Sequence, residues 1–269
     1  MQSRVLVVIG AGGMGQAIAR RVGSGNTVLL ADVREDTLLT VGEALQNEGQ
    51  NVITRLVDVS SPESVRDLAG TAATLGQVGQ IAHTAGLSPV QASVPAILKV
   101  DLLGVALVLD EFGRVVADGG SGVVISSMAG HFAPPFSPEL ERAFSSTPPE
   151  EILSLPFLSE IDDPGTAYAI AKRANVLRVQ AASTPWGKKG ARVNSVSPGI
   201  ISTAMGRQEL SSENGQVMRT MIESSPSGRV GTPDDIASAA AFLLGAESSF
   251  ITGTDLLVDG GVVASFRFA

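Results

Sequence analysis

The chain has 269 residues, 44% of them hydrophobic, and a mean hydropathy of +0.26, so one large α/β domain can bury a sufficient core. Its net charge is −8 with no Lys/Arg-rich run, which argues against a nucleic-acid or anionic-membrane surface. The absence of cysteine excludes disulfides and thiolate chemistry, and two histidines give little basis for a metal site. No run approaches the roughly 18 apolar residues of a membrane span, so we expect a soluble cytoplasmic protein.

Short apolar runs rich in branched residues alternate with segments of helical periodicity along the chain. In chain order the strand-like runs are RVLVVI, NTVLLAD, QNVITRLVD, QIAHTAG, GVVISS, ARVNSVS and DLLVDG. The helical segments include a long one near 94–117, another at about 165–183 and one beginning at TPDDIASAAAFLLG. Strands buried on both faces read as continuous apolar runs, and these do. The pattern predicts an α/β, single-domain Rossmann fold with a doubly wound, mostly parallel seven-stranded sheet covered by helices on both faces.

Residues 131–164 differ from the rest of the chain in composition. They hold seven of the fourteen prolines together with Phe132, Phe136, Phe144 and Phe157. A structureless loop of this length is unusual in a compact domain, so we expect short helices near 138–145 and 149–155. We interpret the segment as an insertion in one domain that spans residues 1–269.

A glycine-rich stretch follows the first strand. VVIGAGGMGQAIA places Gly10, Gly12, Gly13, Met14 and Gly15 where a helix begins. Missing Cβ atoms let backbone amides approach a pyrophosphate, and the helix N-terminus offers partial positive charge. Asp32 ends the second strand, and a carboxylate there can bind the adenosine ribose and repel a 2′-phosphate. The two features together favour NAD over NADP, against the alternative of a plain tight turn with Asp32 as a helix cap.

Asp58 stands at the end of the third strand, in LVDVS. Its side chain can bond the adenine amine while Val59 supplies a backbone amide. It can equally be the N-cap of the next helix, and the sequence leaves both interpretations open.

The motifs GAGGMG, DV at 58, AG at 85, ISSMAG, YAIAK, VNSVSPG and ITGTDLLVDGG occur in the order seen in classical short-chain dehydrogenases/reductases. The resemblance spans essentially the whole chain, and it extends to the subset with an insertion before the catalytic tyrosine, which includes hydroxysteroid dehydrogenase/carbonyl reductase enzymes. It implies a catalytic group of Ser127, Tyr168, Lys172 and Asp101. It also implies cofactor contacts at Tyr168, Lys172, Ala85, Gly86, Pro198, Gly199, Ile201 and Thr203, and a homodimer or homotetramer.

The residue types suit the chemistry that this resemblance implies. A free tyrosine has a pKa near 10 and is a poor base at neutral pH unless cations stabilise its phenolate. Lys172, four positions after Tyr168, and the positive nicotinamide ring would both do so. Tyr168 would then exchange a proton with the substrate oxygen, Ser127 would hydrogen-bond that oxygen, and Lys172 would also hold the cofactor ribose. With four lysines in the chain, chance gives this spacing roughly 1.5% of the time.

Four positions depart from the family pattern. Ile9 replaces a threonine before a shortened glycine loop, and His83 and Thr84 replace two asparagines, with His83 expected to be structural. Asp101 replaces the asparagine whose backbone carbonyl binds a water linked to the lysine. An aspartate offers the same carbonyl, but its carboxylate can instead perturb Lys172.

We therefore expect an NAD-dependent enzyme that interconverts a secondary alcohol and a ketone. The apolar residues of 131–164 and of 200–225 would form a wall suited to a bulky hydrophobic substrate. Equally, the insertion can pack on a neighbouring subunit or cover the long helices. A catalytically inactive NAD-binding regulator is the main alternative, and an epimerase is less favoured because little chain follows residue 200.

Overall fold

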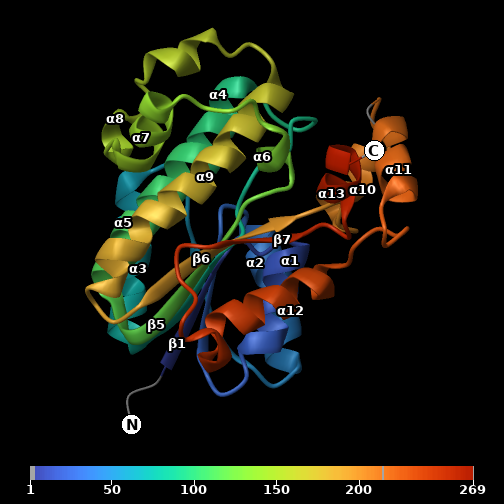
Figure 1. The fold of residues 1–269 in the computed structure, drawn as a ribbon. Coiled ribbons are helices and arrows are strands. Elements are labelled where there is room, and N and C mark those ends of the chain that lie inside the picture. The colour runs from blue at the N-terminus through green and yellow to red at the C-terminus, as the bar shows by residue number, and fades with distance from the viewer. Residues whose placement is uncertain (1–3, 214, 269) are drawn as a thin grey trace.

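The computed structural model describes residues 4–213 and 215–268; residues 1–3, 214 and 269 of the expected domain lie outside this description. Seven parallel strands form one sheet in the order β3-β2-β1-β4-β5-β6-β7 (Figure 1). The strands are β1 (Arg4–Ile9), β2 (Thr27–Asp32), β3 (Asn51–Leu56), β4 (Gln77–His83), β5 (Val116–Ile125), β6 (Arg192–Pro198) and β7 (Asp255–Val258). The predicted fold is confirmed. The strand order reverses between β1 and β4, and in such sheets a ligand crevice lies at the carboxyl ends of these two strands.

Helices cover both faces of the sheet. One face carries α1 (Gly13–Val22), α2 (Glu35–Asn47) and α12 (Pro233–Leu244), and the other carries α3 (Pro62–Leu75), α5 (Gly104–Val115) and α9 (Pro164–Gly187). Side chains alternate along β1, so Leu6 and Val8 join the first core while Val5 and Val7 join the second. Both faces are therefore buried, as the continuous apolar runs predict. Within residues 4–213 and 215–268, none of the helices is apolar over enough length to cross a lipid bilayer.

The expected helix near 94–117 is divided into three parts. It consists of α4 (Val94–Ile97), a π-helical stretch η1 (Leu98–Leu103) and α5. The strand that follows begins at Val116, before the expected residue 122, so the helix ends earlier than predicted. The pairing of β5 with β4 shifts register, from Val78↔Val116 to Gln80↔Ser121. The irregular DGG segment between Val116 and Ser121 breaks the apolar run, so the sequence pattern did not indicate the start of β5.

The 131–164 insertion contains the expected short helices. They are α7 (Pro138–Ser146) and α8 (Pro149–Ile152), the second of which ends before the expected residue 155. Two further elements were not predicted, namely α6 (Ala129–Phe132), which leads into the insertion, and the 3₁₀ turn η2 (Pro156–Glu160). Phe144, Ile152 and Leu158 are buried against apolar residues of η1 and α9. The insertion thus covers the long helices, one of the possibilities that its composition left open, and α7 and α8 lie beside α5 and α9 in Figure 1.

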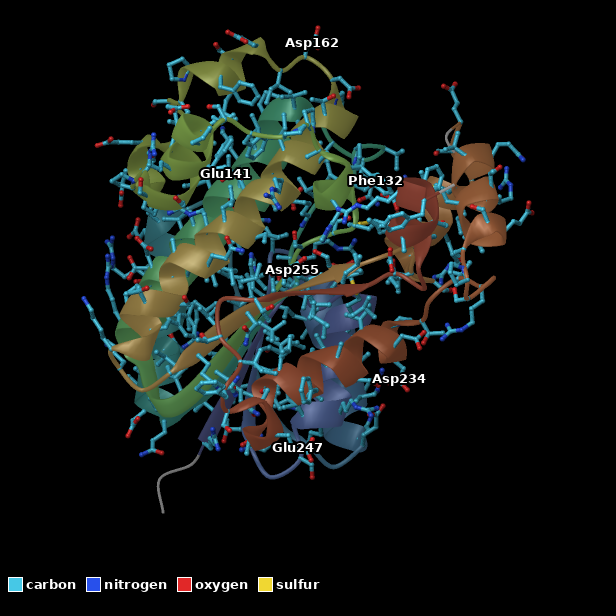
Figure 2. The ribbon with its side chains drawn as sticks, in the orientation of Figure 1. Phe132, Glu141, Asp162, Asp234, Glu247 and Asp255 are labelled. Carbon is cyan, nitrogen blue, oxygen red and sulfur yellow. The ribbon has the colours of Figure 1, made fainter. Side chains whose placement is uncertain are left out.

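The phenylalanines of the insertion divide into two groups. Phe136 packs at a tilt on Phe144 and Phe157 meets it edge to face, with ring centroids 5.1 and 6.4 Å from that of Phe144, within the cluster over η1 and α9. Phe132 instead meets Phe266 edge to face at 5.8 Å. Figure 2 shows Phe132 beside the group formed by α10 (Ala204–Leu210), α11 (Gly215–Ser224) and α13 (Val262–Phe268). Most of the aromatic residues of the insertion therefore serve helix packing.

Candidate active site

The glycine loop joins β1 to α1 and leaves backbone amides open to a ligand. Gly10 has a φ of +99°, and a Cβ atom there would lie 2.5 Å from the amide nitrogen of Ala85. Gly12 is the N-cap of α1, and a Cβ atom on it would meet nothing within 4 Å. The loop therefore packs tightly on the end of β4 while the N-terminus of α1 stays accessible, which fits a pyrophosphate.

A cavity of about 590 Å³ lies over this loop at the carboxyl ends of the strands. It brings together most of the predicted cofactor residues: Gly10, Gly12, Gly13, Met14, Gly15, Asp32, Asp58, Val59, Ala85, Gly86 and Thr203. Arg34, Lys99 and Met205 also line it and were not predicted. Its volume and the glycine loop that lines it fit a dinucleotide.

Asp32 holds two backbone segments at the edge of the cavity. Its Oδ2 accepts a hydrogen bond from the Ala11 amide at 2.7 Å, and its Oδ1 accepts one from the Arg34 amide at 3.0 Å. The N-cap of α2 is Arg34, so the alternative of Asp32 as the cap is wrong. The Arg34 guanidinium is exposed and pairs with Asp36 at 3.4 Å.

Asp58 is exposed at the cavity and does not cap α3. Its Oδ1 accepts hydrogen bonds from the Ser60 amide at 2.9 Å and the Ser60 hydroxyl at 2.7 Å. The N-cap of α3 is Ser61, whose hydroxyl accepts from the Ser64 amide. Of the two interpretations of Asp58, the capping role is wrong.

The two residues that replace asparagines at the end of β4 behave differently. Thr84 donates a hydrogen bond from its hydroxyl to the carbonyl of Gly10 at 2.8 Å, which ties β4 to the glycine loop. His83 is 1% exposed, and in the described part of the chain neither ring nitrogen has a hydrogen-bond partner. Burial and the nearby Lys172 lower the pKa of His83 to about 3, so its ring is neutral at physiological pH.

Tyr168 and Lys172 lie one turn apart on α9. The helix begins at Pro164 with Asp163 as its N-cap, whose Oδ2 accepts from the Thr166 amide at 2.6 Å. The Nζ atom of Lys172 lies 5.3 Å from the centroid of the Tyr168 ring. The same Nζ donates to the carbonyl of Ile125 at 3.5 Å, so the pair sits over the end of β5.

Ser127 lies in the loop after β5, and its Oγ accepts from the Ala129 amide at 3.1 Å. The neighbouring Ser126 hydroxyl donates to the backbone carbonyl of Lys172 at 2.7 Å, which ties this loop to α9. Burial raises the pKa of Tyr168 above its ordinary value, while Lys172 and a hydrogen bond with Ser127 oppose this shift. These contacts bring the predicted serine, tyrosine and lysine together.

Asp101 reaches Lys172 through its side chain. It is fully buried, and its Oδ1 lies 3.5 Å from Lys172 Nζ and accepts from the Leu87 amide at 3.0 Å. A Cβ atom on Gly86 would lie 2.6 Å from this Oδ1 and 3.3 Å from Lys172 Nζ. Because Gly86 also lines the cavity, the predicted catalytic group adjoins the predicted cofactor space.

The end of β6 and the residues after it lie beside the loop that follows β5. Gly199 donates its amide to Val258 at 2.9 Å, and a Cβ atom there would clash with Asp259. Ile201 is buried, and Pro198 accepts from the Met128 amide at 2.8 Å. None of these predicted residues is among those that line the 590 Å³ cavity.

Thr203 does line the cavity and faces the glycine loop. It caps α10, its Oγ1 accepting from the Gly206 amide at 3.0 Å. A Cβ atom on Gly13 would lie 3.2 Å from its methyl carbon. The start of α10 therefore approaches the N-terminus of α1 across the cavity.

Sequence reasoning missed Glu209 on α10. Its Oε1 accepts a hydrogen bond of 2.6 Å from the hydroxyl of the buried Ser88, in the loop after β4. Burial raises the pKa of Glu209, and this carboxylate in turn adds to the raised pKa of Tyr168. The two partners are 121 residues apart, and no motif marks either of them.

Comparisons with known proteins agree with this arrangement. Residues 4–138 match the family model described as short chain dehydrogenase, and residues 158–263 match one described as Enoyl-(Acyl carrier protein) reductase. The chain is 43% identical to short-chain dehydrogenase/reductase bsc3 of Alternaria brassicicola over 98% of this chain and 97% of that protein. It is 29% identical to cis-4-hydroxycyclohexanecarboxylate dehydrogenase of Sinomonas cyclohexanicum over 97% of both chains.

Among solved structures, the fold is similar to that of gox2181. The TM-score is 0.78, with 23% identity over 98% of this chain and 97% of that chain. Together with the two family models, the extent of these similarities shows that the chain belongs to the short-chain dehydrogenase/reductase family of oxidoreductases.

Proposed function

We propose that the chain is an NAD(H)-dependent enzyme that interconverts a secondary alcohol and a ketone with Tyr168 as its general acid/base. One observation supports this most directly. Lys172 Nζ lies 5.3 Å from the Tyr168 ring centroid, and Gly86 joins that pair to the cavity of the glycine loop. A cation beside a tyrosine at the edge of a dinucleotide cavity is suited to proton exchange with a substrate oxygen.

The bound cofactor would supply or accept the hydride at the substrate carbon. In reduction, the Tyr168 hydroxyl gives its proton to the substrate oxygen, and in alcohol oxidation the phenolate removes it. The Ser127 hydroxyl donates a hydrogen bond to the same oxygen, where negative charge develops. Lys172 stabilises the phenolate and holds the cofactor ribose.

Asp32 supports the preference for NAD. Its carboxylate lines the cavity and is fixed by two backbone amides, so it presents a negative charge to the ribose end of the cofactor. A 2′-phosphate there would be repelled. Arg34 lines the same cavity, but its guanidinium is paired with Asp36.

A bulky hydrophobic substrate, cyclic or steroid-like, remains our proposal. Half-buried apolar side chains occur along 200–225, namely Met205, Leu210, Met218, Met221 and Ile222. Phe132 and Phe266 meet beside that segment. The name of the Sinomonas relative also indicates a cyclic alcohol as the substrate of that protein. From the family resemblance we further propose a cytoplasmic homodimer or homotetramer.

Cofactor titration and a ketone screen test this function. Purified protein is titrated with NADH and NADPH by fluorescence, and NADH consumption is followed with cyclic, steroid-like and small polar ketones. We expect tighter NADH binding and faster turnover of the cyclic ketones. Tyr168→Phe should lower kcat by about 10²- to 10⁴-fold while NADH affinity changes little.

The other outcomes identify the alternatives. If NADH binds and neither protein reduces any ketone, the chain is an NAD-binding regulator. If NADPH binds more tightly, the role of Asp32 is wrong. If small polar ketones are the better substrates, the hydrophobic substrate class is wrong while the alcohol/ketone chemistry stands.

A further inference from the structure

Asp101 makes a buried contact with Lys172. The alcohol/ketone reaction proposed above uses Ser127, Tyr168 and Lys172 and needs no carboxylate at this position. Asp101 is 0% exposed and Lys172 is 4% exposed, and 3.5 Å separates Oδ1 from Nζ. Both carboxylate oxygens also lie within reach of the Leu87 amide, at 3.0 and 3.3 Å. The carboxylate is therefore fixed from one side by the loop after β4 and from the other by the lysine.

Two local features create the space for this contact. Asp101 belongs to the π-helical stretch η1, and such stretches often occur at functional sites because they redirect side chains. Gly86 has no Cβ atom, and one placed there would lie 2.6 Å from the Asp101 carboxylate. The backbone on both sides is thus shaped to admit a carboxylate next to Lys172.

The titratable groups around Tyr168 come from four elements. Lys172 on α9 is the cation, Asp101 on η1 and Glu209 on α10 are carboxylates, and His83 on β4 is a neutral ring that faces Lys172. Asp101 and Tyr168 both raise the pKa of Lys172 against the effect of burial, so the lysine keeps its proton. Burial raises the pKa of the Asp101 carboxyl, while the charge of Lys172 and the Leu87 amide favour its ionised form. The attraction of Lys172 for a Tyr168 phenolate is weakened by the carboxylate already beside it, at 3.5 Å.

We propose that Asp101 is a positioning residue that partly neutralises Lys172 and keeps Tyr168 a proton donor at neutral pH, so that the chain favours ketone reduction there and oxidises alcohols in alkaline solution. This inference rests on the proposed function. In reduction the substrate carbon gains hydride, the substrate oxygen gains the tyrosine proton, and the phenolate takes a new proton from solvent. Lys172 stays protonated throughout.

Tyr168 is the only tyrosine in the chain, so its ionisation can be measured without turnover. The ultraviolet absorbance of the phenolate is titrated against pH in cofactor-free wild type, Asp101→Asn, Asp101→Glu and Asp67→Asn. Asp67 is an exposed acid on α3, so its variant controls for the loss of one negative charge. We expect the Asp101→Asn midpoint to fall by about one pH unit or more, while Asp101→Glu and Asp67→Asn stay near wild type.

A midpoint that stays unchanged or rises in Asp101→Asn overturns the proposal. The pH profile of alcohol oxidation gives a second readout, because the rate below the midpoint follows the fraction of phenolate. A downward shift of about one unit makes Asp101→Asn about tenfold faster than wild type at neutral pH. Equal profiles also overturn the proposal.

The two readouts separate this inference from the proposed function. If the phenolate midpoint falls in Asp101→Asn but no ketone is ever reduced, the effect of Asp101 on the ionisation of Tyr168 stands, while the proposed function fails and with it the preference for reduction. If Tyr168→Phe abolishes ketone reduction while the midpoint is unchanged in Asp101→Asn, the function stands and the inference fails.

Discussion

At the residue scale, the site depends on two glycines whose missing Cβ atoms serve different purposes. A Cβ atom on Gly12 would meet no protein atom within 4 Å, so the space beside it is free for a ligand. A Cβ atom on Gly86 would collide with Asp101 and press on Lys172. The first glycine leaves room for the cofactor, and the second leaves room for the buried ion pair.

The two glycines therefore respond differently to alanine. In Gly86→Ala the new methyl group displaces the Asp101 carboxylate and shifts Lys172. Because small displacements of catalytic groups slow the reaction strongly, we expect kcat/KM to fall by about 10²-fold. Thermal stability should fall as well. Gly12→Ala should keep its stability and lose NADH affinity, since its methyl group enters ligand space. Melting curves and NADH titrations compare the two variants. An equal loss of stability in both would contradict the view that Gly12 borders ligand space while Gly86 makes room for Asp101.

At the element scale, the insertion is fastened to α9 by a buried arginine. Arg178 is 6% exposed, and its Nη1 donates to the carbonyls of Phe144 at 3.0 Å and Thr147 at 2.9 Å. Both acceptors lie at the end of α7. Glu141, also on α7, pairs with Arg173 of α9 at 3.3 Å, but the side chains of Arg173 and Glu141 are 37% and 42% exposed. The two arginines thus make a buried and a half-exposed attachment between the same helices.

Replacing each arginine by methionine measures these attachments. Arg178→Met leaves the buried carbonyl of Phe144 and the partly buried carbonyl of Thr147 without their donor, so we expect the free energy of unfolding to fall by about 2 kcal/mol. Limited proteolysis should then cut first within 131–164. Arg173→Met removes an exposed pair and should cost about 1 kcal/mol or less. Urea unfolding measures both, and an equal loss in the two variants would show that burial of Arg178 is not what holds the insertion.

At the scale of the whole molecule, the sequence predicted the elements that repeat a pattern and missed those that depend on unique packing. Buried parallel strands and the glycine loop carry local signals, so the sheet and the cofactor cavity follow from the residues. The start of β5 has no such signal because its pairing with β4 is interrupted after Val116. The hydrogen bond between Ser88 and Glu209 joins distant segments and has no local pattern at all. Aromatic composition likewise did not determine which surface the insertion covers.

Acid stability tests a buried cluster that links distant parts of the fold. Asp255, at the start of β7, accepts hydrogen bonds from Ser195 and Ser197 of β6 and lies 2.8 Å from Nε2 of His131 on α6. The side chain of Asp255 is 9% exposed. Burial opposes its ionisation, but the hydrogen bonds from these three partners hold the pKa of its carboxyl below the ordinary value of 3.8.

The pKa of Asp255 is lower in the folded chain than in the unfolded chain, so its ionised carboxylate stabilises the fold at any pH above the ordinary pKa of 3.8. This contribution is lost as the pH falls below about 4. Asp255→Asn should therefore cost about 1–3 kcal/mol near neutral pH. The gap to wild type should narrow as the pH falls toward about 3. Asp234→Asn, an exposed acid on α12, is the control and should change stability by less than about 1 kcal/mol at either pH. Urea unfolding at both pH values measures the gap, and a gap of constant size would mean that the charge of Asp255 does not hold β6, β7 and α6 together.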